Sequence, residues 1–153
     1  MDALDTTDIG LLVALQKDSK QSIKQLAEKV NLTITPVHER VKKLENLGLI
    51  DKYVAIVNPR KLGKKLVVYC QVTLLKHQEE VLADFEHYIQ SQNEVLEASY
   101  IAGTYDFLLK VVLKDMDDYQ RFILEKVSKL EMVTNIQSSF VIKNIKNTTL
   151  IIP

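Results

Sequence analysis

Asn31–Gly48 reads NLTITPVHERVKKLENLG, and its pattern predicts one helix with a defined start and a defined end. Thr33 is placed to cap the helix, because a threonine hydroxyl can accept a bond from an unpaired N–H of the first turn. Pro36 suits that turn, where a missing N–H costs little, and Gly48 suits the left-handed residue that ends many helices. Apolar side chains recur at spacings of three and four, which aligns them on one stripe: Val37, Val41, Leu44 and Leu47.

The other side of this helix is polar and mainly basic, with His38, Glu39, Arg40, Lys42 and Lys43. A solvated surface helix has the same composition. The segments before and after it therefore decide the interpretation.

Two shorter helical patterns precede this helix. Leu4–Gln16 has a broad apolar face and several residues that can cap its start, and Ser22 with Gln25 forms a capping box for a short helix that ends at Val30. A short helix, a connection of about three residues and an exposed basic helix form the pattern of a helix-turn-helix, whose second helix enters the DNA major groove. A three-helix bundle without a partner is the alternative.

In the DNA-binding interpretation, polar side chains at the start of the last helix reach base edges, and nearby cations bind phosphates. Arg40 also has a structural alternative, as the ion-pair partner of Glu39 or Glu45. The candidate DNA-binding residues are Ser22, Thr33, Thr35, Pro36, His38, Glu39, Arg40, Lys42, Lys43 and Lys52.

After Gly48 the pattern becomes extended. Residues 49–57 predict a short strand that ends at Asn58-Pro59, and the stretch 52–65 holds five basic residues and no acidic one. Such a strand and its cationic loop suit a wing or a hinge that touches phosphates. The turn at Gly63 places a domain boundary near 58–65.

The second half alternates strand and helix patterns. Strands are expected over 66–75, 95–102, 105–114 and 133–146, and helices over 78–92 and 116–130. This βαββαβ order is that of a ferredoxin-like domain, so the fold class is α+β. We expect a winged helix-turn-helix over 1–58, a linker over 59–65 and the ferredoxin-like domain over 66–153. The exposed face of its sheet and the apolar tail favour dimerisation.

Charge divides the chain in the same way. Residues 1–65 hold 12 Lys and Arg against 8 Asp and Glu, and residues 66–153 hold 8 against 12, so a net charge of zero hides a basic first half. We interpret this charge asymmetry as the sign of a polyanionic partner for the first half. The alternative is that the imbalance arose by chance. The single Cys70 fits a reducing cytoplasm, no apolar run is long enough for a membrane span, and the acidic start does not resemble a secretory signal.

No motif indicates an enzyme or a cofactor. The three histidines, His38, His77 and His87, share no metal-ligand spacing, and the chain has neither a glycine-rich phosphate loop nor a nucleophile elbow.

The ordered combination of motifs resembles the leucine-responsive regulatory protein/AsnC family of transcription regulators over nearly the whole chain. The matching residues are Leu4-Asp5, Asp8-Ile9, Gln25-Leu26-Ala27, Val30, Leu32-Thr33, Thr35-Pro36-Val37, Arg40-Val41-Lys42-Lys43-Leu44-Glu45, Gly48-Leu49-Ile50, Tyr53, Pro59, Leu62-Gly63 and Gly103-Thr104-Tyr105-Asp106-Phe107.

The resemblance implies a DNA-binding transcriptional regulator with a second domain that senses an amino acid, and dimers that assemble into octamers. It also implies an effector loop at Gly103, Thr104, Tyr105 and Asp106. Backbone N–H groups of this loop suit a ligand carboxylate, Asp106 suits the ammonium, and hydroxyls of Ser138 and Ser139 are further candidates. In the alternative interpretation Gly103 only closes a hairpin that Asp106 caps. The alternative function is an amino-acid-binding module that regulates a protein partner instead of DNA.

Overall fold

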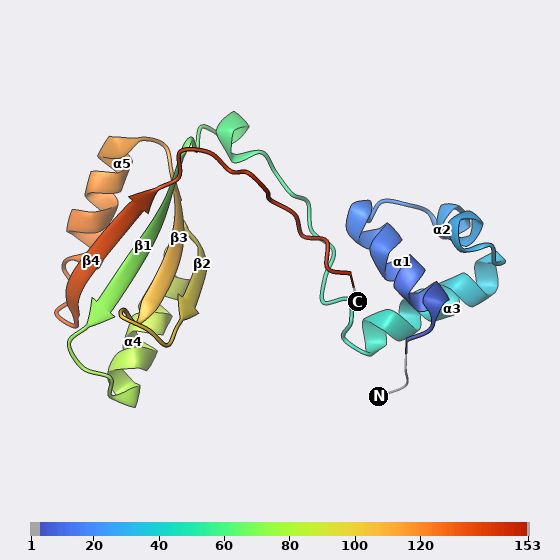
Figure 1. Cartoon of the computed structure of the whole chain (residues 1–153), viewed down its shortest axis with the longest axis horizontal. Coiled ribbons are helices and arrows are strands. Elements are labelled where there is room, and N and C mark those ends of the chain that lie inside the picture. The colour runs from blue at the N-terminus through green and yellow to red at the C-terminus, as the bar shows by residue number, and fades with distance from the viewer. Residues whose placement is uncertain (1–3, 153) are drawn as a thin grey trace. The chain divides into compact units, whose positions relative to one another are not determined.

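The computed structural model describes residues 4–152 and divides into two compact units (Figure 1). Of the described residues, one unit comprises 4–56 together with 145–152, and the other comprises 57–144. Residues 1–3 and 153, which the expected domains include, lie outside the described part. The two units are described separately.

The first unit is built from three helices: α1 (Thr6–Lys17), α2 (Ile23–Val30) and α3 (Ile34–Asn46). Asp5 caps α1 by accepting a bond from the N–H of Asp8, and the predicted capping box between Ser22 and Gln25 is present at the start of α2. Their apolar sides meet in one core of nine buried residues: Leu11, Leu12, Ala14, Leu15, Leu26, Ala27, Val37, Val41 and Leu44.

The C-terminal end of α3 has the conformation that the sequence predicts, but its N-terminal end lacks the predicted capping hydrogen bond. Gly48 is left-handed with φ 68°, as predicted. Thr33 is the N-cap residue, but its side chain makes no capping hydrogen bond, so that prediction is wrong. The physical reason is Pro36. It occupies the third helical position, one of the two whose N–H an N-cap side chain normally binds, and proline has no N–H.

The strand expected after Gly48 is not formed. Residues 51–57 are extended but belong to no sheet, and their apolar side chains are exposed, with Ile56 74% accessible. A strand needs a neighbour for its backbone groups, and the described part of this chain supplies none there. The wing strand predicted from sequence is therefore absent.

The C-terminal tail lies beside the first unit, although we expect residues up to 153 in the second domain. Residues 145–152 group with the first unit. The physical reason is a reciprocal contact between Gln16 and Ile151: the Gln16 amide donates to the Ile151 carbonyl at 2.8 Å and accepts from its N–H at 2.7 Å.

The second unit has the predicted βαββαβ order. Its elements are a 3-10 turn η1 (Pro59–Leu62), β1 (Leu66–Leu74), α4 (Glu79–Gln90), β2 (Val95–Tyr100), β3 (Phe107–Leu113), α5 (Met116–Arg121), the π-helical η2 (Phe122–Val127) and β4 (Val133–Phe140). The strands form one sheet in the order β2-β3-β1-β4, and all three pairs are antiparallel. The last strand is shorter than the expected 133–146.

One face of this sheet is covered and the other is bare (Figure 1). Helices α4 and α5–η2 pack on the covered face, where Phe85, Ile89, Phe122 and Val127 contact alternate residues of β1 and β3. The bare face presents the intervening residues, among them Tyr69 and Leu108, which are only half-buried.

Candidate functional site

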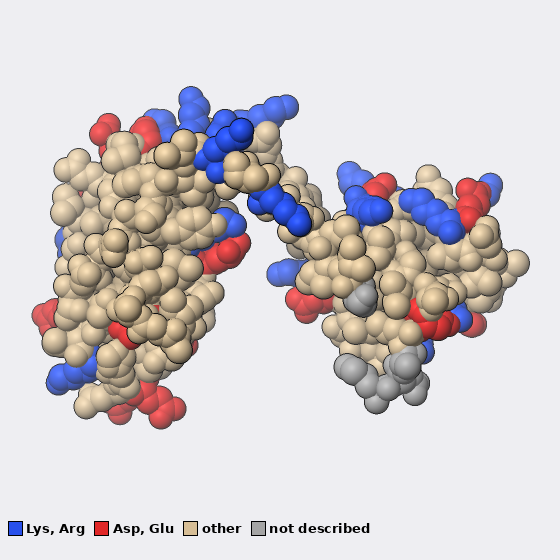
Figure 2. Space-filling model, viewed as in Figure 1, with Lys and Arg blue, Asp and Glu red and all other residues tan. Residues whose placement is uncertain are grey.

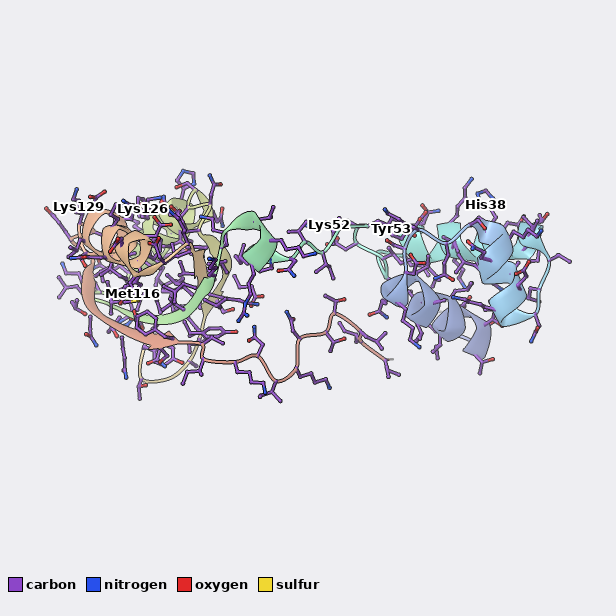
Figure 3. All side chains as sticks on the ribbon, turned by 90° about the horizontal axis from the view of Figure 1, so that it is seen from above. His38, Lys52, Tyr53, Met116, Lys126 and Lys129 are labelled. Atoms are coloured by element: carbon purple, nitrogen blue, oxygen red, sulfur yellow. The ribbon has the colours of Figure 1, made fainter. Side chains whose placement is uncertain are left out.

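Helix α3 presents one polar stripe to solvent. Thr35, His38 and Lys42 are all exposed. At 3.6 residues per turn they fall within roughly 60° of one another, and about 120° around the helix from the flank that carries Val37, Val41 and Leu44 into the core. We call these three residues the outward stripe, and Figure 3 labels its central residue, His38. With the apolar side buried, the outward stripe remains accessible to a partner.

Ile34 lies beside the outward stripe and was not among the sequence candidates. It is the first residue of α3 and is 54% exposed. Its spacing of three from Val37 continues the apolar stripe, so the pattern alone gave it no role on the surface. An exposed isoleucine at the start of such a helix suits contact with a thymine methyl group.

Arg40 does not lie on the outward stripe. Its Nη1 donates to the Asp8 Oδ1 and to the Asp5 Oδ2, both at 2.6 Å. The structural alternative to DNA contact is thus supported, but with partners from α1 and not Glu39 or Glu45. The Asp8 N–H and Arg40 together hold the pKa of Asp5 below its ordinary value of 3.8, and the hydrogen bonds to Asp8 and then Asp5 raise the pKa of Arg40.

The remaining sequence candidates are placed around α3. Glu39, Lys43 and Lys52 are exposed, and Pro36 is half-buried in the first turn. Ser22 is exposed at the start of α2, where its hydroxyl and N–H are both occupied by the capping box. Pro36, Glu39 and Lys43 thus lie on α3 and Ser22 at the start of α2, whereas Lys52 lies on the extended segment that follows α3 (Figure 3).

Tyr53 ties that extended segment to α3. Its hydroxyl donates to the Glu45 Oε1 at 2.8 Å. Partial burial, and then this carboxylate, raise the pKa of Tyr53 to about 12. The contact holds the segment after α3 in place without any strand pairing.

Basic side chains gather around η1 in the second unit (Figure 2). Arg60, Lys61 and Lys65 are exposed. Within residues 4–152, neither these three side chains nor Lys52 forms an ion pair. Exposed cations without carboxylate partners suit the phosphates of a nucleic acid.

The loop after β2 brings together Gly103, Thr104, Tyr105 and Asp106. Among the described residues no hydrogen bond engages the N–H groups of Gly103, Thr104 or Tyr105. The Asp106 side chain, 14% exposed, uses both oxygens: Oδ2 accepts from the Leu74 N–H and Oδ1 contacts the His77 Nε2, each at 2.7 Å. The loop thus offers amide donors to an anion, while Asp106 is occupied by its own chain.

Ser138 and Ser139 do not join this loop within one chain. They pair with Cys70 and Tyr69, whereas the loop runs into Phe107, which is level with Val72. Two to three residues of strand, roughly 7–10 Å, separate them along the sheet. Neighbouring strand residues also point to opposite faces, so the two hydroxyls diverge.

The described residues form neither a metal site nor a membrane-spanning helix. No three His, Cys, Asp or Glu side chains within residues 4–152 converge on a metal-binding position. Over the same residues, every helix is too short or too polar to cross a lipid bilayer.

Both halves of the chain match models of known families. Residues 4–51 match the winged helix-turn-helix DNA-binding domain, and residues 67–151 match the Lrp/AsnC ligand binding domain. Together the two matches span most of the chain.

Curated relatives and solved structures agree with these matches. The chain is 37% identical over 147 residues to a proline dehydrogenase transcriptional activator from Rhizobium radiobacter, which covers 96% of this chain and 94% of the relative. It is 35% identical over 150 residues to the leucine-responsive regulatory protein of Haemophilus influenzae, covering 98% and 90%. A transcriptional regulator from Neisseria meningitidis, solved as a complex with L-Met, superposes with a TM-score of 0.93 at 33% identity, covering 96% and 95%.

Proposed function

Because the chain belongs to the Lrp/AsnC family, we propose that it is a sequence-specific DNA-binding transcriptional regulator that responds to an amino acid. Effector binding changes either its assembly or its affinity for DNA. The observation that supports this most strongly is the outward stripe of α3. It is exposed along its whole length, on a helix whose apolar side is buried in a core.

The DNA contacts divide by chemistry. Thr35 and His38, with Thr33 before them, lie where a recognition helix meets base edges, and Glu39 can accept from a cytosine amino group. Lys42, Lys43 and Lys52 bind phosphates, and Ser22 lies at the start of the helix that crosses the DNA backbone. Pro36 shapes the first turn and makes no polar contact itself.

The effector site begins at the loop 103–106. An amino acid needs donors for its carboxylate, and the unengaged N–H groups of Gly103, Thr104 and Tyr105 are such donors. The ammonium goes to Asp106 when His77 releases Oδ1, because that oxygen is otherwise occupied. The L-Met complex of the Neisseria regulator makes L-methionine the first ligand to try.

A matched pair of variants tests this site. Gly103→Ala meets no atom within 4 Å of its new Cβ, so the fold tolerates it, but the methyl group stands beside the amide donors. We expect weaker amino-acid binding in calorimetry for Gly103→Ala and for Asp106→Ala, and unchanged binding for Ala83→Ser on the exposed side of α4. Wild-type affinity in Asp106→Ala would remove Asp106 from the site.

The assembly is a homodimer that builds to an octamer. The bare sheet face and the exposed Val54, Ile56 and Ile151 are apolar surfaces that a second copy covers. We place the protein in the cytoplasm and assign it no catalytic activity and no cofactor. Native mass spectrometry with and without amino acids measures the number of subunits, and a monomer under all conditions contradicts the assembly.

Retardation of promoter DNA in gels is the decisive experiment. We expect retardation that weakens as salt rises, and that shifts when a mixture of the twenty amino acids is added. Retardation of no DNA at low salt contradicts the regulator and favours a module acting on a protein partner. Retardation that no amino acid alters contradicts the effector.

A further inference from the structure

Within the described part of the chain, Asp8 is the one charged residue that is buried, with 1% of its surface exposed. A buried carboxylate is costly unless a cation or several donors compensate it. It lies in the first turn of α1 and takes no part in the proposed DNA contacts. Its only ion-pair partner among the described residues is Arg40 on α3.

Three side chains form this contact, which we call the Asp–Arg anchor: Asp5, Asp8 and Arg40. Asp5 plays two parts, because its Oδ1 accepts the Asp8 N–H at 2.8 Å while its Oδ2 accepts from Arg40. The cap of α1 and the link to α3 are therefore one connected structure. Arg40 is the residue of α3 that this structure holds.

Arg40 faces away from the proposed DNA surface. At 100° per residue its direction is roughly 170° from the middle of the outward stripe. Its guanidinium is one positive charge between two carboxylates, so the anchor is net negative. A phosphate approaching Arg40 meets that negative charge, and a base edge on the outward stripe lies on the other side of the helix.

We propose that Asp8 and Asp5 hold Arg40 as a positioning residue, which fixes the rotation of α3 against α1 so that the outward stripe faces the DNA. This inference rests on the proposed function. The apolar core alone leaves this rotation less defined, because Val37, Val41 and Leu44 have no directional contacts. A two-carboxylate anchor on a planar guanidinium has a fixed geometry.

Specificity measurements distinguish positioning from direct contact. A duplex is first selected on the wild-type chain from a random library, and binding to it and to a scrambled duplex is followed by fluorescence anisotropy over a salt series. The variants are Asp8→Asn, Arg40→Gln and the double variant. The matched control is Lys42→Gln, a cation of the same helix that lies on the outward stripe.

We expect Asp8→Asn and Arg40→Gln each to lower the ratio of selected to scrambled affinity by about tenfold, the order of one mismatched base pair. The double variant lowers this affinity ratio no further than either single variant does, because both substitutions break the same anchor. The salt slope stays that of the wild type. Lys42→Gln weakens both duplexes alike and lowers the slope by about one.

Any one of three outcomes overturns the inference. If Arg40→Gln relaxes the preference at one base pair while Asp8→Asn binds DNA as the wild type does, Arg40 contacts a base directly. A salt slope reduced by about one in Arg40→Gln makes it a phosphate contact. If circular dichroism finds either variant unfolded, the milder Asp5→Asn and Arg40→Lys decide: wild-type ratios in both contradict positioning. A wild-type chain that enriches no duplex contradicts the proposed function itself, and this is seen before any variant is compared.

Discussion

Ile34 exposes an apolar side chain at the first position of α3, beside the outward stripe. In a helix that enters the major groove, this position faces base edges, and the apolar feature there is the thymine methyl group. The side chain therefore has a specific chemical partner if the helix reads DNA. Sequence periodicity could not reveal it, because its spacing assigns it to the core.

We predict that Ile34→Ala weakens binding to the selected duplex by about 1 kcal/mol, the order of one or two buried methyl groups. Replacing thymine by uracil in the duplex removes the same methyl group and is expected to cost the wild type a similar amount, but to leave Ile34→Ala unaffected. Anisotropy titrations measure both. Leu47→Ala, at the exposed far end of α3, is the matched control, and a wild type indifferent to uracil contradicts the contact.

Tyr53 gives a second prediction at this scale. Since its folded pKa is raised to about 12, its contribution to stability is fully present below the ordinary value of 10.0 and is lost as pH rises towards 12. We expect an ultraviolet titration of the folded chain to contain a late tyrosinate step that Tyr53→Phe removes. Tyr105→Phe is the control, and a late step that survives Tyr53→Phe assigns it to another tyrosine.

At the scale of elements, η2 is joined to the start of β2 by one ion pair. The Lys126 Nζ contacts both oxygens of Glu94, at 2.8 and 2.9 Å. Burial is the largest single influence and raises the pKa of Glu94, but the hydrogen bond and charge of Lys126, a backbone hydrogen bond and the charge of Lys64 together outweigh it, so the pKa lies below the ordinary 4.5. The carboxylate form is thus the one that the fold stabilises.

We predict that Glu94→Gln lowers the free energy of unfolding by about 0.5 kcal/mol at neutral pH, as for a partly exposed ion pair. The difference from the wild type persists above pH 4.5 and closes as pH falls through the lowered pKa, because the wild-type carboxylate is then protonated as well. Urea unfolding at a series of pH values measures it. Glu86→Gln on the exposed side of α4 is the control, and an equal difference at low and neutral pH contradicts the ion pair.

Elements that depend on neighbouring residues could be predicted from the sequence, and contacts between distant residues could not. The capping box at Ser22, the helix end at Gly48 and the βαββαβ order all follow from spacing within a few residues. Arg40 was assigned the wrong partners because Asp5 and Asp8 lie more than thirty residues away. The extended pattern over 49–57 predicts a strand, but strands form only where another strand supplies hydrogen bonds.

The candidate site shows the same division. The exposure of His38 and Lys42 follows from helical periodicity, and the structure places them accordingly. The engagement of Asp106 by Leu74 and His77 depends on how β1 and β3 are paired, which periodicity does not determine. Ser138 and Ser139 are candidates because their hydroxyls suit the effector site that the resemblance implies, and strand register separates them from the loop within one chain.

At the scale of the whole molecule, the bare face of the sheet is the feature that a single chain leaves unexplained. Leu108 lies on it between Gln71 and Ser99, and Tyr69 lies opposite Lys110. A four-stranded sheet buries one face against α4 and α5–η2, and half-buried apolar side chains on the other face lose contact with water when a second sheet packs there. The proposed dimer provides such a sheet.

We therefore predict that Leu108→Asp separates the assembly into single chains or smaller oligomers, because a carboxylate would be desolvated between two facing sheets. Native mass spectrometry and sedimentation measure the loss of larger species, and circular dichroism verifies that the fold persists. Ala83→Asp adds the same charge on the exposed side of α4 and is expected to leave the assembly intact. An unchanged assembly in Leu108→Asp would mean that the copies meet elsewhere, and the exposed residues 53–57 are then the next surface to alter. In the proposed dimer two helix-turn-helix units are linked, so Leu108→Asp is also expected to weaken retardation of a duplex with two half-sites far more than of a duplex with one.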